Sequence, residues 1–149
     1  MKIALGCDHG GFSHKNAIYE YLQKNGYDVI DFGIYEEKAV DYPDIAQKVC
    51  RSIQSGECDR GILICGTGIG MSLAANKFKG IRAAACSEHF SAKYTRLHND
   101  ANILCLGGRV IGIGTALELT DLFVKTDFEG GRHQNRVNKI TEIEKNGGI

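Results

Sequence analysis

The stretch Gly61-Ile62-Leu63-Ile64-Cys65-Gly66-Thr67-Gly68-Ile69-Gly70 joins a short apolar run to a series of glycines. An apolar run of this length, bounded by glycine, is typical of a strand that is buried on both faces. The glycines allow the backbone to turn tightly before a helix predicted over residues 70–78. The stretch therefore predicts a strand, a tight loop and a helix, which is the repeating unit of a parallel α/β sheet.

Similar apolar runs recur along the chain at intervals that leave room for a helix between them. They predict five strands, over residues 3–7, 29–32, 61–65, 81–86 and 102–106. The predicted helices cover residues 13–24, 43–53, 70–78, 87–97, 115–124 and 134–145. This alternation indicates an α/β fold, a single doubly wound Rossmann-like (flavodoxin-like) domain over residues 1–149 with a five-stranded parallel sheet.

The composition excludes several classes of protein. Lysine plus arginine and aspartate plus glutamate both number 18, so no net charge is available to hold nucleic acid or an anionic membrane surface. No apolar run is long enough to span a membrane, and no targeting segment is recognisable, which predicts a cytoplasmic location. The six cysteines form no C-x-x-C pair, so free thiols are expected in place of disulfides or a zinc site.

Ligands of doubly wound sheets bind where the strand order reverses, at the carboxyl ends of the strands. In the flavodoxin-like order the first and third strands adjoin at that point. Asp8 and His9 would then face Cys65 and Thr67, and Tyr42 would join them from the loop after the second strand.

The glycine loop after Cys65 predicts an anion-binding site, because its backbone N–H groups can converge on one point. Met71 stands where the dinucleotide fingerprint has its third glycine, and the loop lacks the lysine of a P-loop, so nucleotide binding is disfavoured. A phosphatase is disfavoured as well, because no arginine follows at the sixth position after the cysteine. Donors near a helix start stabilise a thiolate, so Cys65 is a candidate base or nucleophile. The other cysteines are predicted to be small buried hydrophobes: Cys7, Cys50, Cys58, Cys86 and Cys105.

Two further groups of residues lie far from Cys65 in the predicted topology. His98 and Asn99 precede the fifth strand, so they belong at the opposite edge of the sheet, about 17–20 Å away. Either His98 is an ordinary surface histidine at a helix end, or a second subunit supplies it. Arg132 and Arg136 follow a glycine pair at a helix start, which suits a phosphate, although a solvated basic face is the alternative. His14, His89 and His133 are predicted to be surface residues.

Six short blocks in this order resemble the family of ribose-5-phosphate isomerase B and the galactose-6-phosphate isomerase subunits. The resemblance runs nearly end to end and rests on Gly6-Cys7-Asp8-His9-Gly10, Asp41-Tyr42-Pro43, Cys65-Gly66-Thr67-Gly68-Ile69-Gly70, Ala75-Asn76-Lys77, His98-Asn99-Asp100 and Glu129-Gly130-Gly131-Arg132-His133. It implies interconversion of ribose 5-phosphate and ribulose 5-phosphate without a metal or organic cofactor. It also implies a homodimer or dimer of dimers, with the active site shared between subunits and the segment from about residue 126 packing over the partner.

The resemblance also implies roles for individual residues. Cys65 matches the proton-abstracting base, a role that some relatives give to a glutamate at the place of Met71. His98 and Thr67 match residues that help to open the sugar ring, and Asp8 matches one that handles hydroxyl protons. The residues that match substrate contacts are His9, Tyr42, Gly66, Gly68, Ile69, Gly70, Asn99, Arg109, Arg132 and Arg136. Two alternatives stay open: an isomerase of a six-carbon sugar phosphate (allose 6-phosphate or galactose 6-phosphate), and a noncatalytic sugar-phosphate sensor.

Overall fold

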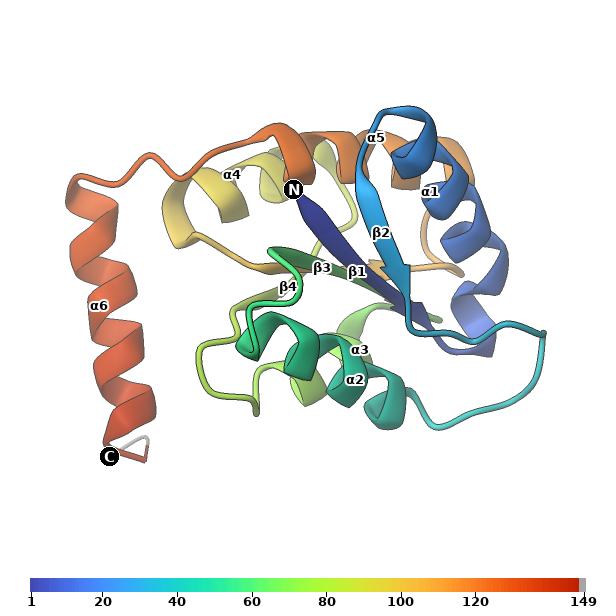
Figure 1. The fold of residues 1–149 in the computed structure, drawn as a ribbon. Helices are drawn as coiled ribbons and strands as arrows, with labels where there is room; N and C mark the ends of the chain where they lie inside the picture. Colours follow the sequence, from blue (N-terminus) through green and yellow to red (C-terminus); the bar gives the residue numbers. More distant parts are fainter. Residues whose placement is uncertain (148–149) are drawn as a thin grey trace.

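The apolar runs form a sheet of five parallel strands at the centre of the molecule (Figure 1). The computed structural model describes residues 1–147. The strands are β1 (Lys2–Cys7), β2 (Asp28–Asp31), β3 (Arg60–Cys65), β4 (Ala83–Ala85) and β5 (Ile103–Gly107). All residues of β3 and β5 are buried, which explains why these strands are continuously apolar in sequence. The predicted α/β class with a five-stranded parallel sheet is confirmed.

The order of the strands is β2-β1-β3-β5-β4. The predicted adjacency of β1 and β3 is found, with Ile3 opposite Arg60 and Cys7 opposite Ile64. The second half of the sheet differs from the flavodoxin-like order, in which β4 would lie beside β3. Here β5 lies beside β3 and β4 lies at the edge of the sheet. The physical reason is the difference in residue composition between β5 and β4. The large apolar residues of β5 are fully buried, whereas the three alanines of β4 are only partly covered and suit a short edge strand.

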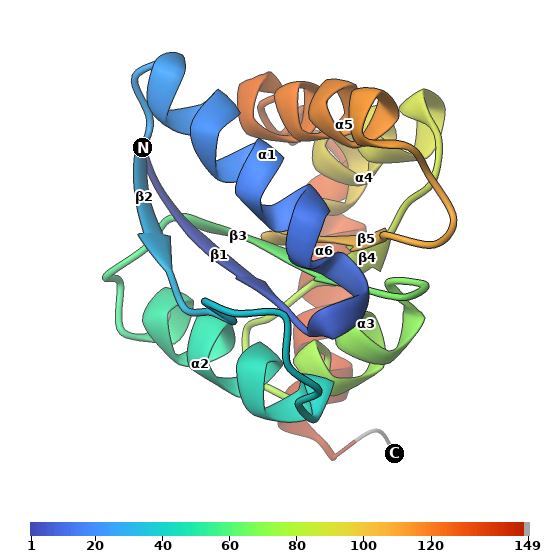
Figure 2. The same cartoon turned by 90° about the vertical axis from the view of Figure 1, so that its right-hand side faces the viewer.

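Residues 1–147 form six helices, five of which pack on the sheet. They are α1 (Phe12–Lys24), α2 (Tyr42–Gln54), α3 (Ile69–Ala75), α4 (His89–Asn99), α5 (Ile113–Lys125) and α6 (Arg132–Lys145), and a 3-10 turn, η1 (His9–Gly11), precedes α1. Helices α1, α4 and α5 cover one face of the sheet, and α2 and α3 cover the other (Figure 2). Pro43 lies in the first turn of α2, and Ile45 and Val49 are buried beneath that helix, as their spacing predicts.

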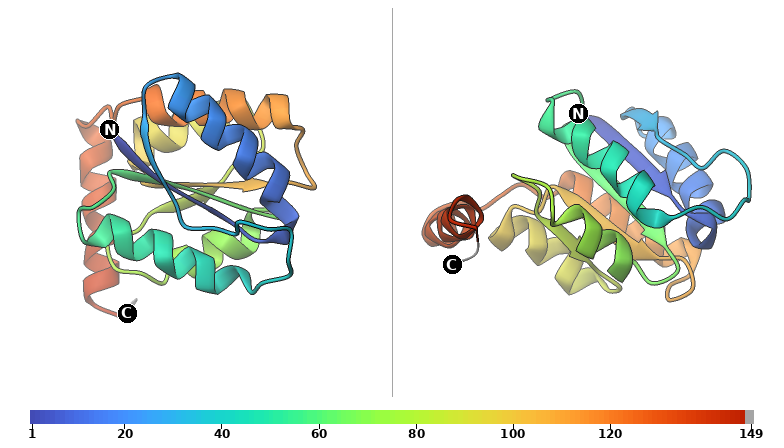
Figure 3. Two further views of the ribbon diagram at one scale, coloured as in Figure 1. Left: turned by 45° about the vertical axis from the view of Figure 1, so that its right-hand side comes forward. Right: turned by 90° about the horizontal axis from the view of Figure 1, so that it is seen from below.

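Helix α6 stands beside the three layers and not on either face of the sheet (Figure 3). It begins two residues earlier than predicted and contacts α4. The backbone N–H of Gly80 also donates to a carboxylate oxygen of Glu144 at 2.9 Å. Val137 is buried, but Ile140 and Ile143 are 46% and 59% exposed, so α6 presents apolar surface that one chain leaves uncovered. Among residues 1–147, no helix has both the length and the apolar character needed to cross a membrane.

Candidate active site

Three loops meet at the carboxyl edge of the sheet, where β1, β3 and β5 end. The backbone N–H of Gly108 donates to the carbonyl oxygen of Cys65 at 2.8 Å, and that of Arg109 donates to the oxygen of Gly66 at 3.0 Å. On the other side, the N–H of Asp8 donates to the oxygen of Ile64 at 3.1 Å. The loop after β5 therefore reaches the Cys65 loop because β5, and not β4, is the neighbour of β3.

The loops approach one another so closely that only glycine fits at two of the contacts. A Cβ atom on Gly10 would lie 2.8 Å from the backbone nitrogen of Gly66, and one on Gly108 would lie 2.2 Å from the oxygen of Gly10. These are contacts between backbone atoms, which side-chain rotation cannot relieve. The glycines at this edge thus bring the three loops into direct contact.

Cys65 is the last residue of β3, and its sulfur faces the glycine loop. Its Sγ accepts a hydrogen bond from the backbone N–H of Gly68 at 3.1 Å. Gly68 holds this position in the left-handed region, with φ of +78°, immediately before α3. Cys65 is 4% exposed, so the amide–sulfur interaction is largely screened from water and is stronger for that reason. A thiolate at this position would receive a charge-assisted hydrogen bond.

The other five cysteines are also free and buried, but the local environment is different. Burial raises the pKa of Cys7 and Cys86 to about 11 and that of Cys50 to about 12. Burial raises the pKa of Cys58 and Cys105 as well. These five thiols are thus held in the protonated form by their surroundings, as suits apolar packing groups.

Several predicted site residues lie around Cys65 on the same edge. The carboxylate of Asp8 is 7% exposed and accepts the N–H of Gly10 at 2.8 Å. The ring of Tyr42 lies over Gly70, where an added Cβ would come within 2.8 Å of the ring carbon Cζ. The residues that the structure gathers at this edge are Asp8, His9, Tyr42, Cys65, Gly66, Thr67, Gly68, Ile69, Gly70 and Arg109.

Four predicted residues lie elsewhere in the chain: His98, Asn99, Arg132 and Arg136. His98 and Asn99 end α4, just before β5. Since Ile103 pairs with Gly61 and Gly107 pairs with Cys65, the start of β5 is at the amino edge of the sheet. A strand of this length spans about 17 Å, so one chain does not bring His98 to Cys65. Arg132 and Arg136 open α6, on the same side as His98.

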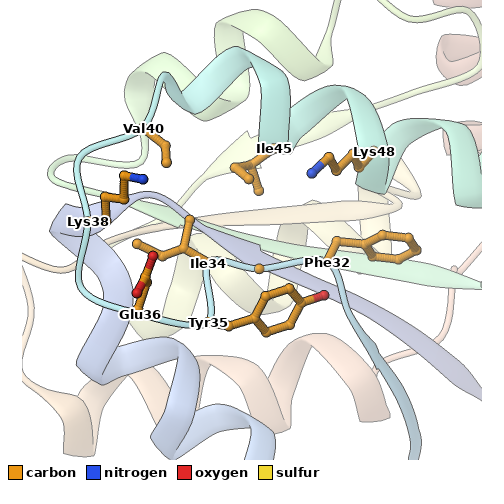
Figure 4. Close-up of a pocket in the computed structure, with 9 residues that line it drawn as sticks. Phe32, Ile34, Tyr35, Glu36, Lys38, Val40, Ile45 and Lys48 are labelled. Atoms are coloured by element: carbon orange, nitrogen blue, oxygen red, sulfur yellow. The ribbon is translucent and has the colours of Figure 1, made fainter.

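A cavity of about 450 Å³ lies between the segment after β2 and the first turns of α2 (Figure 4). Ile34 and Ile45 contribute apolar surface, and the amines of Lys38 and Lys48 lie at its margin. None of its lining residues is a predicted site residue. Buried Lys15 of α1 supports this segment by donating to the carbonyl oxygen of Ile34 at 2.9 Å. The cavity is therefore lined by the β2–α2 connection and α2, and does not include the Cys65 loop.

Comparison with known proteins gives a consistent result. The family model described as Ribose/Galactose Isomerase matches residues 3–140. This chain belongs to that family. It is 51% identical to ribose-5-phosphate isomerase B of Escherichia coli strain K12 over 144 residues, which are 97% of either chain. The predicted enzyme class, an aldose–ketose isomerase, is confirmed by this membership.

Solved structures of the Ribose/Galactose Isomerase family show the same fold. Ribose-5-phosphate isomerase B of Clostridium thermocellum has a TM-score of 0.97 and 56% identity, with 99% of each chain covered. The Mycoplasma genitalium enzyme, solved with bound ribulose-5-phosphate, has a TM-score of 0.93 and 41% identity, with 97% of this chain and 96% of that one covered.

The surface prediction for His133 is wrong. The residue is 3% exposed, and its ring stacks on that of His98 with centroids 4.0 Å apart and an interplanar angle of 12°. Glu129 lies in the loop before α6, and one of its carboxylate oxygens is 3.7 Å from His133 Nε2, a contact that no helical periodicity in the sequence predicts. His14 is half-buried, and its Nε2 lies 2.8 Å from the carbonyl oxygen of Ile111, so it too is more than a surface residue. His89 is exposed, as predicted.

Proposed function

We propose that the chain interconverts D-ribose 5-phosphate and D-ribulose 5-phosphate through an enediolate, with Cys65 as the base. The observation that carries this proposal is the hydrogen bond from the Gly68 amide to the Cys65 sulfur within a glycine loop. The names of the relatives from Escherichia coli and Clostridium thermocellum support the pentose phosphate as substrate. The six free thiols suit a reducing compartment, so we place the reaction in the cytoplasm.

The chemistry requires a base and a site for negative charge. Cys65 would take the proton from C2 of the open-chain sugar, and the enediolate oxygen would receive hydrogen bonds from amides of residues 66–70. Losing one such donor typically costs about 3–4 kcal/mol of transition-state stabilisation. Protonation at C1 then completes the shift of the carbonyl group. We assign Asp8 and Thr67, whose side chains accept backbone N–H groups on the same edge, to proton exchange with sugar hydroxyls.

The side chains that bind the phosphate and open the sugar ring would come in part from a second copy of the chain. His9, Tyr42 and Arg109 lie with Cys65, whereas His98, Asn99, Arg132 and Arg136 lie on the other side of the domain. We propose a homodimer, or a dimer of such dimers, in which residues from about 126 onward cross to the partner. The exposed Ile140 and Ile143 of α6 provide apolar surface for this contact.

Turnover tests the proposal directly. The protein mixed with ribose 5-phosphate should form ribulose 5-phosphate, and failure to do so would exclude ribose 5-phosphate as the substrate. The Cys65→Ala variant should lose exchange of the C2 proton with solvent deuterium while still binding the sugar phosphate. Retained exchange in that variant would remove Cys65 from the role of base.

Subunit mixing tests the shared site. Cys65→Ala and His98→Ala chains should each be inactive alone, because each removes one half of every site. A mixed dimer contains one site with both residues intact, so activity should return on mixing. Absence of recovery, with subunit exchange verified by mass, would count against a site shared between two chains.

A second candidate substrate is a six-carbon sugar phosphate. The description of the matching family names galactose as well as ribose, and this observation favours a hexose phosphate as the alternative substrate. Parallel measurement of kcat/KM for ribose 5-phosphate, allose 6-phosphate and galactose 6-phosphate decides between them. A higher value for either hexose phosphate would replace the pentose as the proposed substrate.

A further inference from the structure

His133 lies at the centre of a group of polar and charged side chains, a position that the sequence alone did not predict for it. It is the second residue of α6 and is 3% exposed. Arg132 Nε lies 3.5 Å from its Nε2, and Arg136 Nη1 lies 3.4 Å from its Nδ1. On its open face the ring stacks on His98 of α4, and a carboxylate oxygen of Glu129 lies 3.7 Å from Nε2 of both rings.

These neighbours determine the charge of His133. Burial, followed by the positive charge of His98, lowers its pKa below the usual 6.5, and the two arginines act in the same direction. Glu129 opposes this effect. His133 is therefore neutral at pH 7. A neutral imidazole has one nitrogen with a free lone pair, so it can accept an N–H from one guanidinium, while the second guanidinium contacts the other ring nitrogen.

A metal site would be the other explanation for this cluster. Ligand atoms of His98, Glu129 and His133 all lie within 4.8 Å of one another. However, imidazole lone pairs lie in the ring plane, and the two planes are stacked nearly parallel, so the lone pairs do not converge on a single ion. Two guanidinium groups beside His133 also oppose the binding of a cation. The geometry favours hydrogen bonding to the arginines.

We infer that His133 is a positioning residue, a buried acceptor that orients one guanidinium of the pair Arg132 and Arg136 for the substrate's phosphate while its ring supports His98. This inference rests on the proposed function, in which the two arginines bind that phosphate. The residue acts in two ways that can be separated, because the lone pair orients an arginine and the ring face supports His98. In this arrangement His133 itself does not touch the sugar.

Two substitutions separate these roles. His133→Phe keeps an aromatic ring against His98 but removes the lone pair, and His133→Gln keeps an acceptor but removes the ring. We expect His133→Phe to raise KM for ribose 5-phosphate, and the inhibition constant of inorganic phosphate, about ten- to hundredfold, the size of one lost hydrogen bond to a charged group. Its kcat should stay within about twofold. His133→Gln should restore the phosphate constants. His89→Phe, an exposed position on α4, serves as the control.

Equal KM values and equal phosphate inhibition constants for His133→Phe and His133→Gln would overturn the inference. The acceptor nitrogen would then contribute nothing beyond side-chain packing. Arg132→Ala separates this failure from failure of the proposed function. If Arg132→Ala weakens phosphate binding and His133→Phe does not, only the positioning role is lost; if neither does, the proposed phosphate site is wrong and the inference with it. Should the variants fold poorly, nitrogen NMR of the wild-type ring decides, because a doubly protonated His133 at pH 7 cannot accept a hydrogen bond and would refute the role.

Discussion

Gly68→Ala should damage both the stability of the fold and the reaction, because Gly68 is constrained in two independent ways. Its φ of +78° costs an alanine about 1–2 kcal/mol. The added Cβ would lie 3.0 Å from the carbonyl carbon of Leu106 and 3.1 Å from the oxygen of Cys105, both backbone atoms of β5. Overpacking of this kind costs about 1–3 kcal/mol more. The combined loss of about 2–5 kcal/mol corresponds to a fall in Tm of about 5–15 °C for a domain of this size.

The same displacement would move the Gly68 amide away from the Cys65 sulfur. A hydrogen bond to a charged group contributes about 1.5–3 kcal/mol, so kcat/KM for ribose 5-phosphate should fall about ten- to hundredfold. Gly56→Ala is the matched control, because its φ is +77° but no atom lies within 4 Å of the added Cβ. Gly56→Ala should lose only the about 1–2 kcal/mol of stability that an alanine at positive φ costs, and it should keep full activity. If Gly68→Ala were as active as Gly56→Ala, the amide–sulfur contact would have no part in the reaction.

Three other measurements examine different parts of the structure. At about pH 8 a thiol reagent should label Cys65 first in the folded protein, because burial raises the pKa of the other five thiols; peptide mapping that finds another site labelled first would contradict this. Lys15→Met should destabilise the protein by about 3 kcal/mol or more in chemical denaturation, since it leaves Asp31 and a buried carbonyl unpaired; a loss below about 1 kcal/mol would show that this ion pair is dispensable. Below about pH 6.5 the wild type should lose Tm relative to His133→Gln, because the unfolded chain takes up a proton that folded His133 resists; a pH-independent difference would mean that His133 does not titrate in this way.

The parts of the fold that the sequence predicts well are those with local signals. Buried strands such as β3 are continuous apolar runs, and Pro43 marks the start of α2, so both elements lie close to their predicted positions. The order of β4 and β5 has no local signal, because a helical crossover precedes each of the two strands. Only the contrast between the fully buried β5 and the short alanine strand β4 indicates which of them lies inside.

The candidate site likewise contains some residues that have a local sequence signal and others that have none. The Cys65 loop is contiguous in sequence, so its residues could be named together from the chain alone. Arg109 lies beside Gly66 only because β5 is the neighbour of β3, and pattern analysis could not derive that contact. The burial of His133 was missed because the residues around it are polar and typical of a surface. His133 is buried because α6 packs against α4, a contact between segments that are far apart in sequence.

The position of β5 has a consequence for how the molecule is assembled during synthesis. Until residues 103–107 leave the ribosome, β3 has one open edge and β4 has no strand to pair with, since among residues 1–147 β4 pairs with β5 alone. Much of the central layer therefore depends on pairing between residues that are far apart in sequence, which slows folding. A nascent chain that ends before residue 103 would expose an apolar strand edge, and such intermediates are the ones that chaperones bind.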